Sequence, residues 1–321
     1  MKEKTTPTSP KTLWFALSLV VFSFIIFGNS IRNGFSMDDD LVTSTSENYL
    51  LEDVEQGISG IPAIFKRRYV SNGNQNYSYR PVTSASFAIE RSLYSTDDFD
   101  KRASFSHFIN ILLYGVIGVM LFFLLLRLLP DINIWLAWIT VLIFMVHPIH
   151  SEVVNNIKCR DELLVFIFGL SALFQTLKGI KENKTKWYRY LLTFLFIALS
   201  ALSKKTGLVF MGLIPLTILF HTKTNLRRLI PFIVLGILGG LMLIFTAKLL
   251  IDQPKSVRQH LFFENPLYAD GNFSDKLGTF FYSIGWYCKM MVWPYPLRYY
   301  YGYNQVPIAA WGSLIPGLGL W

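Results

Sequence analysis

Three carboxylates stand together in the sequence at Asp38, Asp39 and Asp40, shortly after its first long apolar segment. Crowding like charges beside a region of low dielectric constant raises the pKa of at least one of the carboxyl groups toward neutrality. A carboxylate with such a pKa suits the role of a general base that takes a proton from a hydroxyl nucleophile. A solvated run of charges is the competing interpretation, because loops are polar for many reasons.

A second polar cluster runs from His147 to Glu162, between two apolar segments. His147, His150 and Glu152 have side chains that bind metal ions. A His-x-x-His pair with one carboxylate has low specificity, however, and Pro148 interrupts a helical presentation of the ligands. We therefore expect no resident metal ion, while a divalent ion stays open as an alternative. Packing of His147 at the membrane interface is the alternative, but two histidines together with Arg160 and Glu162 at one membrane face argue against it.

Basic side chains gather on the same side of the predicted membrane: Arg80, Lys158, Arg160 and Lys204, with Lys289 as a further candidate. Cations at a lipid boundary that face carboxylates suit a phosphate-linked lipid substrate, because the cations hold the phosphate while an aspartate acts on the acceptor. Snorkelling of the lysines to the membrane surface is the alternative for any one of them.

The elements that position these residues are apolar. The chain has 321 residues, of which 52% are hydrophobic and 16% are charged, and this composition excludes the soluble-enzyme and disordered classes. Seven uncharged runs approach the length of membrane helices: Leu13–Ile31, Phe108–Leu126, Ile132–Val146, Leu163–Leu177, Tyr190–Ser203, Thr206–Phe220 and Leu229–Ala247. The first is too long for a signal-peptide core, so we expect a retained signal anchor. The pattern predicts an all-α fold, a polytopic membrane helical bundle.

The segments between these runs differ in charge. With a cytoplasmic N-terminus, the inside segments carry a net charge of +9 and the outside segments −2, leaving Lys289 and Arg298 unassigned. This positive-inside asymmetry predicts a multi-pass protein with a cytoplasmic N-terminus and a site on the external, periplasmic or lumenal face. No basic surface is left for nucleic acid.

The first external segment, 32–107, is far longer than a connection requires, and loops of this length are usually functional. Apolar residues near helical spacing predict amphipathic helices at Tyr49–Tyr69 and Val82–Leu93 along the membrane surface. The final apolar run, Val306–Trp321, stops abruptly, which indicates a C-terminal truncation. We expect one membrane-embedded module over 1–321, with 32–107 as its external catalytic loop.

Six short motifs occur in order along the chain. They are Asn33-Gly34-Phe35-x-Met37-Asp38-Asp39, Tyr79-Arg80-Pro81-Val82-Thr83, His147-Pro148-Ile149-His150-Ser151-Glu152-Val153-Val154, Arg160-Asp161-Glu162-Leu163, Leu202-Ser203-Lys204-Lys205-x-Gly207 and Lys289-x-x-x-Trp293-Pro294-x-Pro296-Leu297. Each motif alone is weak. Together they resemble the multi-span glycosyltransferases of the GT-C superfamily, most closely the transmembrane and tetratricopeptide-repeat O-mannosyltransferase group and its bacterial relatives.

The resemblance implies a GT-C-like enzyme that moves a mannose-like sugar from a polyprenyl-phosphate carrier to an acceptor protein, glycan or lipid on the external or lumenal face. It places two aspartates at the catalytic centre, Asp38 and Asp39. It also implies a set of substrate-binding residues: Arg80, His147, His150, Glu152, Arg160, Glu162, Lys204 and Lys289. The mechanism we expect is a single inverting displacement. One aspartate takes the acceptor proton and the cations stabilise the departing phosphate, without a nucleotide and without a required metal ion.

The chain departs from this family at two positions. The family usually has Lys-Glu where this chain has Lys204-Lys205, and Cys159 stands where a glycine often precedes the arginine. The alternatives are a polytopic transporter or lipid flippase, and a catalytically inactive membrane scaffold of the same fold. The apolar runs are nearly free of charge, which argues against a transporter. Lys205 replaces the family's usual glutamate, so an inactive scaffold stays an alternative.

Overall fold

The computed structural model describes residues 9–48, 50–72, 75–181, 186–221 and 272–297, with parts of 230–251. The chain divides into two compact units, 1–256 and 257–321, and each is described by itself. The predicted apolar runs at 229–247 and 306–321 lie largely or wholly outside the described residues. The all-α prediction is confirmed: the described elements are helices apart from one small hairpin.

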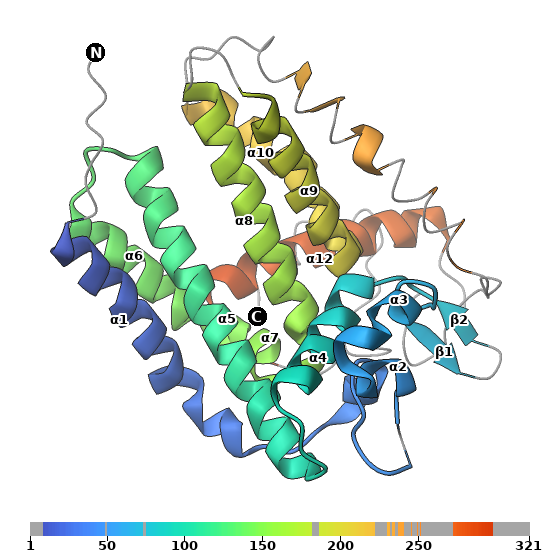
Figure 1. Cartoon of the computed structure of the whole chain (residues 1–321). Helices are drawn as coiled ribbons and strands as arrows, with labels where there is room; N and C mark the ends of the chain where they lie inside the picture. Colours follow the sequence, from blue (N-terminus) through green and yellow to red (C-terminus); the bar gives the residue numbers. More distant parts are fainter. Residues whose placement is uncertain are drawn as a thin grey trace. The chain divides into compact units, whose positions relative to one another are not determined.

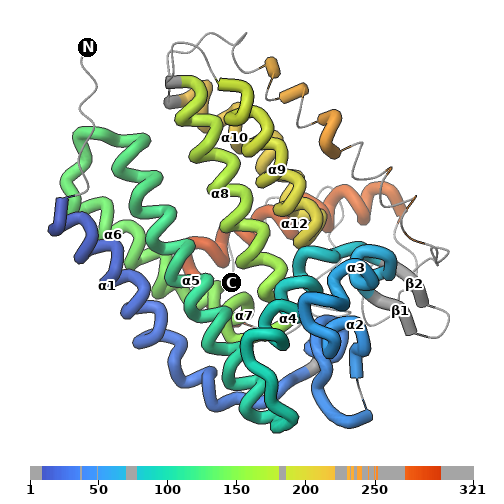
Figure 2. The backbone as a smooth tube through the Cα atoms, in the orientation of Figure 1, coloured from blue at the N-terminus to red at the C-terminus, as the bar shows by residue number. Residues whose placement is uncertain are grey.

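Among its described residues, the first unit is built on six main helices. They are α1 (Pro10–Phe27), α5 (Phe99–Leu128), α6 (Ile134–Met145), α8 (Arg160–Lys181), α9 (Trp187–Ser203) and α10 (Phe210–His221). Helix α1 packs along α5, α5 contacts α6 and α8, and α8 packs along α9, as the ribbon and tube views show (Figures 1 and 2).

Three described helical segments are long and apolar enough to cross a membrane: Pro10–Arg32, Phe99–Leu128 and Ile157–Ile180. A fourth is present if the pair Ile134–Met145 and Pro148–Asn155, bent by 55°, counts as one span. The predicted helices at 190–203 and 206–220 are confirmed as helices. However, α9 has 17 residues and α10 has 12, fewer than the ~20 that a bilayer core requires. Their crossing of the membrane stays a prediction, and so does the predicted total of seven spans.

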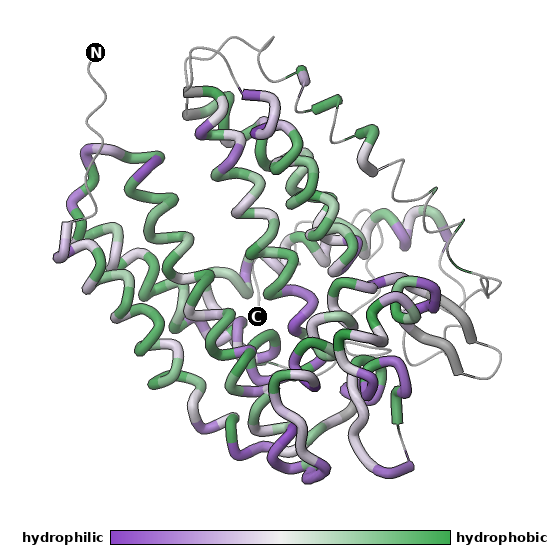
Figure 3. The backbone as a smooth tube through the Cα atoms, viewed as in Figure 1, coloured by the Kyte–Doolittle hydropathy of each residue, from purple (hydrophilic) through white to green (hydrophobic). Residues whose placement is uncertain are grey.

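Helix α1 has one face in the protein and one outside it. Phe15 and Leu19 are buried, and the Phe15 ring meets that of Trp138 on α6 at 5.7 Å. Trp14 and Ile25, by contrast, are 73% and 71% exposed. Large apolar side chains on the open face of a helix are expected where the surrounding solvent is lipid. Figure 3 shows hydrophobic residues along α1, α5 and α8, with hydrophilic residues gathered in the loops and at helix ends.

The long segment between α1 and α5 folds into short elements. In chain order they are η1 (Gly28–Arg32) and η2 (Met37–Leu41), which are 3-10 helices, then α2 (Glu52–Glu55), η3 (Gly57–Gly60), α3 (Ile61–Ile64), β1 (Val70–Asn72), β2 (Gln75–Tyr77) and α4 (Pro81–Leu93). They share a buried apolar cluster, the loop core: Val42, Val54, Ile64, Tyr69, Phe87, Ala88, Ala103 and Ile157. Because α5 and the segment before α8 contribute Ala103 and Ile157, the loop core joins this region to the membrane helices.

The helix predicted at Val82–Leu93 is confirmed as α4, but the one predicted at Tyr49–Tyr69 is broken into α2, η3 and α3. Gly57 causes the first break because its φ is +64°, a left-handed conformation that side chains with a Cβ rarely adopt. Pro62 stands at the start of α3, and its missing N–H prevents a continuous helix through this point. The antiparallel hairpin, with Val70 opposite Tyr77, was not predicted.

Ion pairs hold the short helices against α4 and α5. The Glu55 carboxylate accepts from Arg91 Nε at 2.9 Å and also from Arg102. Burial by itself would raise the pKa of Glu55, but hydrogen bonds from Ser44 and Arg102 and the charges of Arg102 and Arg91 outweigh it and lower the pKa. Glu55 therefore stays ionised and links α2 to two other helices.

Three short helices connect α6 to α8: η4 (Pro148–His150), α7 (Ser151–Asn155) and η5 (Ile157–Cys159); a fourth, η6 (Lys205–Val209), joins α9 to α10. In the second unit the described helix is α12 (Phe273–Val292). Asn272 caps it by accepting from the Asp275 backbone N–H at 2.9 Å. The helix ends at Val292, shortly before Pro294, because a proline disfavours helical conformation in the residue that precedes it.

Candidate active site

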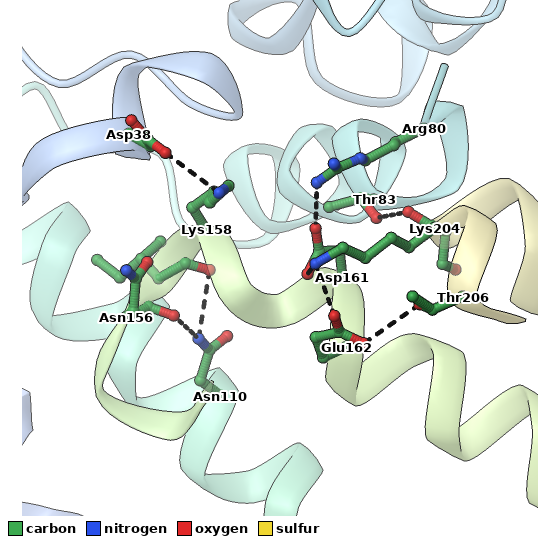
Figure 4. Close-up of polar contacts among 12 residues, drawn as sticks. Asp38, Arg80, Thr83, Asn110, Asn156, Lys158, Asp161, Glu162, Lys204 and Thr206 are labelled. Carbon is green, nitrogen blue, oxygen red and sulfur yellow. Dashed lines mark hydrogen bonds and ion pairs between the residues drawn. The ribbon is translucent and has the colours of Figure 1, made fainter. Parts of the chain in front are cut away.

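Four of the predicted site residues meet around the junction of η5 and α8, residues 158–162: Asp38, Arg80, Glu162 and Lys204 (Figure 4). Segments far apart in the sequence reach this junction: η2 after the first span, the start of α4, and the end of α9. Asp161 and Glu162 occupy the first turn of α8, where negative charge is stabilised by the unpaired backbone N–H groups of a helix start. The junction therefore carries charges of both signs within one turn.

Asp39 is buried and anchors η2 to this junction. One carboxylate oxygen accepts from the Ser36 backbone N–H at 2.8 Å, and the other accepts from the Lys158 backbone N–H at 2.9 Å. Burial and the charges of Asp38 and Asp40 raise its pKa against these backbone hydrogen bonds. Both oxygens hold main-chain donors and the residue is 1% exposed, so Asp39 fastens η2 to η5; its catalytic role stays a prediction.

Asp38 is placed differently. Its side chain is 61% exposed and pairs with the Lys158 ammonium at 3.2 Å (Figure 4). An exposed pair of this kind is weak and exchanges readily with water or with a ligand. Of the two predicted catalytic aspartates, Asp38 is therefore the one that an incoming hydroxyl group can reach.

A second ionic group lies on the other side of the junction. Buried Asp161 accepts from Arg80 Nη1 at 2.5 Å and from Lys204 Nζ at 3.4 Å. Lys204 also pairs with Glu162 at 2.6 Å, and Glu162 accepts from the Thr206 hydroxyl at 3.4 Å. Among the described residues, the Arg80 side chain contacts Asp161 and the Tyr69 ring, so most of its five N–H donors are open to a ligand.

Lys204 is held in place by its neighbours. The Thr83 hydroxyl donates to the Ser203 carbonyl at 2.9 Å, which ties the end of α9 to α4. Burial by itself would lower the pKa of Lys204, but the carboxylates of Asp161 and Glu162 outweigh it and raise the pKa. Lys204 is therefore a fixed cation near neutral pH.

Arg160, also predicted as a substrate ligand, is surrounded by groups of the protein. Its side chain is 1% exposed and pairs with Glu90 of α4 at 2.6 Å. It also donates to Asn110 Oδ1 at 2.8 Å and to the Ser106 carbonyl at 3.1 Å, both on α5. The guanidinium lies 3.9 Å from the centre of the Phe87 ring. These contacts enclose Arg160 and join the three helices α4, α5 and α8 next to the junction.

The histidines predicted as substrate ligands pack against aromatic rings. The His150 ring lies 4.4 Å from that of Phe144 and 5.7 Å from that of Tyr114. His147 Nδ1 accepts from the Ile149 backbone N–H at 3.3 Å and so begins η4. Glu152 is exposed on α7. Among the described residues no group of three or more metal-binding side chains is close enough to hold an ion.

Lys289 lies on α12 in the second unit, with its ammonium 4.7 Å from the Trp286 ring centre. Its predicted place beside the other residues is therefore not tested. Sequence reasoning missed Glu90, Ser106 and Asn110, the partners of Arg160. A signal was present for Glu90, because it is the one acidic residue in the segment 81–93; Ser106 and Asn110 are small polar residues with no such signal.

The geometry and the hydropathy together define the class: the described part of the chain is a polytopic α-helical membrane protein with an ionic site at the start of α8. Comparison with known proteins agrees with the resemblance predicted from the motifs. The chain is 31% identical over 199 residues to the protein O-mannosyl-transferase F38B6.6 of Caenorhabditis elegans, an alignment that covers 60% of this chain and 26% of the relative.

Two mouse proteins are similar as well. Protein O-mannosyl-transferase TMTC3 is 29% identical over 192 residues, covering 58% of this chain and 19% of the relative. Protein O-mannosyl-transferase TMTC1 is 28% identical over 202 residues, covering 59% and 20%. The aligned part of this chain thus spans 19% to 26% of the length of these relatives. No protein-family model matches the chain, and no solved structure matches it.

Proposed function

We propose that this chain is a membrane glycosyltransferase of the GT-C type, which transfers a mannose-like sugar from a polyprenyl-phosphate carrier to a protein acceptor. The observation that carries the proposal is the convergence of Asp38, Arg80 and Lys204 on the start of α8. A reachable carboxylate and two cations lie around one junction, as the transfer of a sugar from a lipid phosphate to a hydroxyl group requires. The names of the similar proteins support the same chemistry.

In this proposal the residues have separate roles. Asp38 takes the proton of the acceptor hydroxyl, and transfer inverts the configuration at the sugar carbon. Arg80 and Lys204 hold the carrier phosphate, because each has donors beyond those that Asp161 and Glu162 occupy. Asp39 and Arg160 position η2 and α8.

Segment 32–107 is the proposed catalytic loop, on the external or lumenal face that the charge asymmetry predicts. Several predicted ligands keep their proposed binding roles: His147, His150, Glu152, Glu162 and Lys289. An apolar cavity of about 260 Å³ opens between α8, α9 and α10, lined in part by Ile197, Phe210 and Ile214. Its lining and its place among the membrane helices suit the prenyl tail of the donor.

The test is transfer of label from radioactive polyprenyl-phosphate mannose to protein in membranes that contain the chain. Asp38→Asn should lower transfer by at least ~100-fold, because a general base contributes about that much or more. Asp131→Asn is the matched control, since Asp131 is an exposed aspartate in the turn between α5 and α6 and should keep full transfer. Equal transfer by Asp38→Asn and the wild type would reject Asp38 as the base. No transfer by the wild type would favour the inactive scaffold.

A further inference from the structure

Tyr69 is buried beside the candidate active site. It belongs to none of the motifs from which that site was predicted. It lies between α3 and β1, where its backbone N–H donates to the Ser78 carbonyl at 3.2 Å. The side chain is 5% exposed and forms part of the loop core. The Arg80 guanidinium lies over the ring, 4.5 Å from its centre. The ring therefore supports the cation that pairs with Asp161.

The hydroxyl group of Tyr69 is buried and has no hydrogen-bond partner among the described residues. The other tyrosines of this region differ. Tyr114 is 2% exposed, and its hydroxyl donates to the Met145 carbonyl at 3.0 Å; the Tyr79 hydroxyl donates to the Phe65 carbonyl at 2.8 Å. Buried polar groups in native proteins are nearly always satisfied, so an exception calls for a specific explanation.

The Tyr69 hydroxyl lies among charged groups of the candidate active site. The charges of Arg80, Asp161 and Asp38 all act on the phenol, and burial raises its pKa well above its ordinary value. Tyr69 therefore stays protonated near neutral pH and has one O–H donor to offer. A fixed donor without a protein acceptor, beside a guanidinium group, suits an acceptor that arrives with an anionic ligand.

We propose that Tyr69 contacts the substrate: its hydroxyl donates a hydrogen bond to a phosphate oxygen of the polyprenyl-phosphate sugar, beside the Arg80 guanidinium. This inference rests on the proposed function and adds a residue to it. During transfer the bond between the sugar C1 and the phosphate oxygen breaks, with its electron pair going to the phosphate. The acceptor oxygen bonds to C1, and its proton passes to Asp38.

The phosphate gains one negative charge in this step, so the hydrogen bond from Tyr69 is stronger in the transition state than in the bound substrate. The Tyr69 hydroxyl therefore raises kcat more than it lowers KM. The free protein, in contrast, gains nothing from this hydroxyl, because it is buried without a partner.

The test compares Tyr69→Phe with Tyr114→Phe, since each removes one buried hydroxyl and keeps the ring. Tyr69→Phe should lower kcat for transfer from polyprenyl-phosphate mannose roughly 10- to 100-fold, the effect of losing one hydrogen bond to a charged group. Its melting temperature should equal or exceed that of the wild type. Tyr114→Phe should show the opposite pattern, a lower melting temperature with kcat close to that of the wild type, because the Met145 carbonyl loses its donor.

A second measurement uses polyprenyl phosphate alone, the product of transfer. It should raise the melting temperature of the wild type, and raise that of Tyr69→Phe by less, because the ligand stabilises the folded state in proportion to its affinity. Unchanged kcat and an unchanged ligand-induced shift in Tyr69→Phe would overturn the role of Tyr69 alone. A wild type that neither transfers sugar nor responds to polyprenyl phosphate would overturn the proposed function, and this inference with it.

Discussion

Replacing Glu90 by alanine tests the structural role of Arg160. The guanidinium of Arg160 is 1% exposed and the Glu90 side chain 12% exposed, with 2.6 Å between the paired atoms. Removing one partner of a buried ion pair costs about 3–5 kcal/mol, because the other charge is left without compensation. Arg160 keeps its hydrogen bonds to Asn110 and Ser106, so we expect the lower end, about 3 kcal/mol in the free energy of unfolding.

The assay is equilibrium unfolding in mixed detergent micelles, followed by tryptophan fluorescence. Asp97→Ala serves as the control, because Asp97 pairs with Arg91 at 3.2 Å while its side chain is fully exposed, and exposed pairs contribute little. The double variant Glu90→Ala with Arg160→Met removes both charges. It should be more stable than the sum of the two single effects predicts, by at least ~1 kcal/mol.

Two results would refute this reasoning. Glu90→Ala would unfold as the wild type does if the Arg160 charge were compensated by water rather than by Glu90. Strictly additive single effects in the double variant would show that the two side chains do not interact.

Two further predictions concern single positions. A Cβ on Gly207 would meet the Ser200 backbone at 2.5 Å, whereas one on Gly212 would meet nothing within 4 Å. Gly207→Ala should therefore lower the free energy of unfolding by about 1–3 kcal/mol, while Gly212→Ala should leave it unchanged or raise it by up to about 1 kcal/mol; equal losses would contradict the packing described. The lowered pKa of Glu55 means that its contribution to stability is complete above the unfolded value of about 4.5 and is lost as the pH falls through the folded pKa. The difference in free energy of unfolding between wild type and Glu55→Gln should thus be constant above about pH 4.5 and shrink below it. Unfolding measured at a series of pH values checks this. If the ion pairs were absent, the difference would not change with pH.

The membrane helices were predictable because an apolar run of sufficient length has few alternatives to a helix in lipid. The predicted runs at 13–31, 108–126 and 163–177 all fall within described helices. Their ends were less predictable, since α5 begins nine residues earlier than its apolar run (Phe99 against Phe108). The polar residues of that first part, such as Arg102 and Ser106, face the loop region, and hydropathy alone does not reveal such partners.

The sequence predicted several residues of the site, but it did not predict which of them are buried and which are exposed. Asp38 and Asp39 are neighbours of the same type, yet one is exposed and the other is buried with two backbone donors. Arg160 and Lys204 both read as phosphate ligands, but Arg160 is enclosed by Glu90 and α5. Such differences depend on contacts between residues far apart in the chain, which a local pattern does not contain.

The junction at 158–162 also sets the order in which the protein can be assembled during synthesis. Lys158 and Asp161 find partners at Asp38 and Arg80, which a ribosome has already produced, but the other cation on Asp161 is Lys204, more than forty residues later. Until that residue has emerged, the first turn of α8 carries a carboxylate with only part of its neutralising charge. A nascent chain halted before residue 204 therefore has Arg80 as the one cation on Asp161 among these contacts, and the ionic group is complete when Lys204 has emerged.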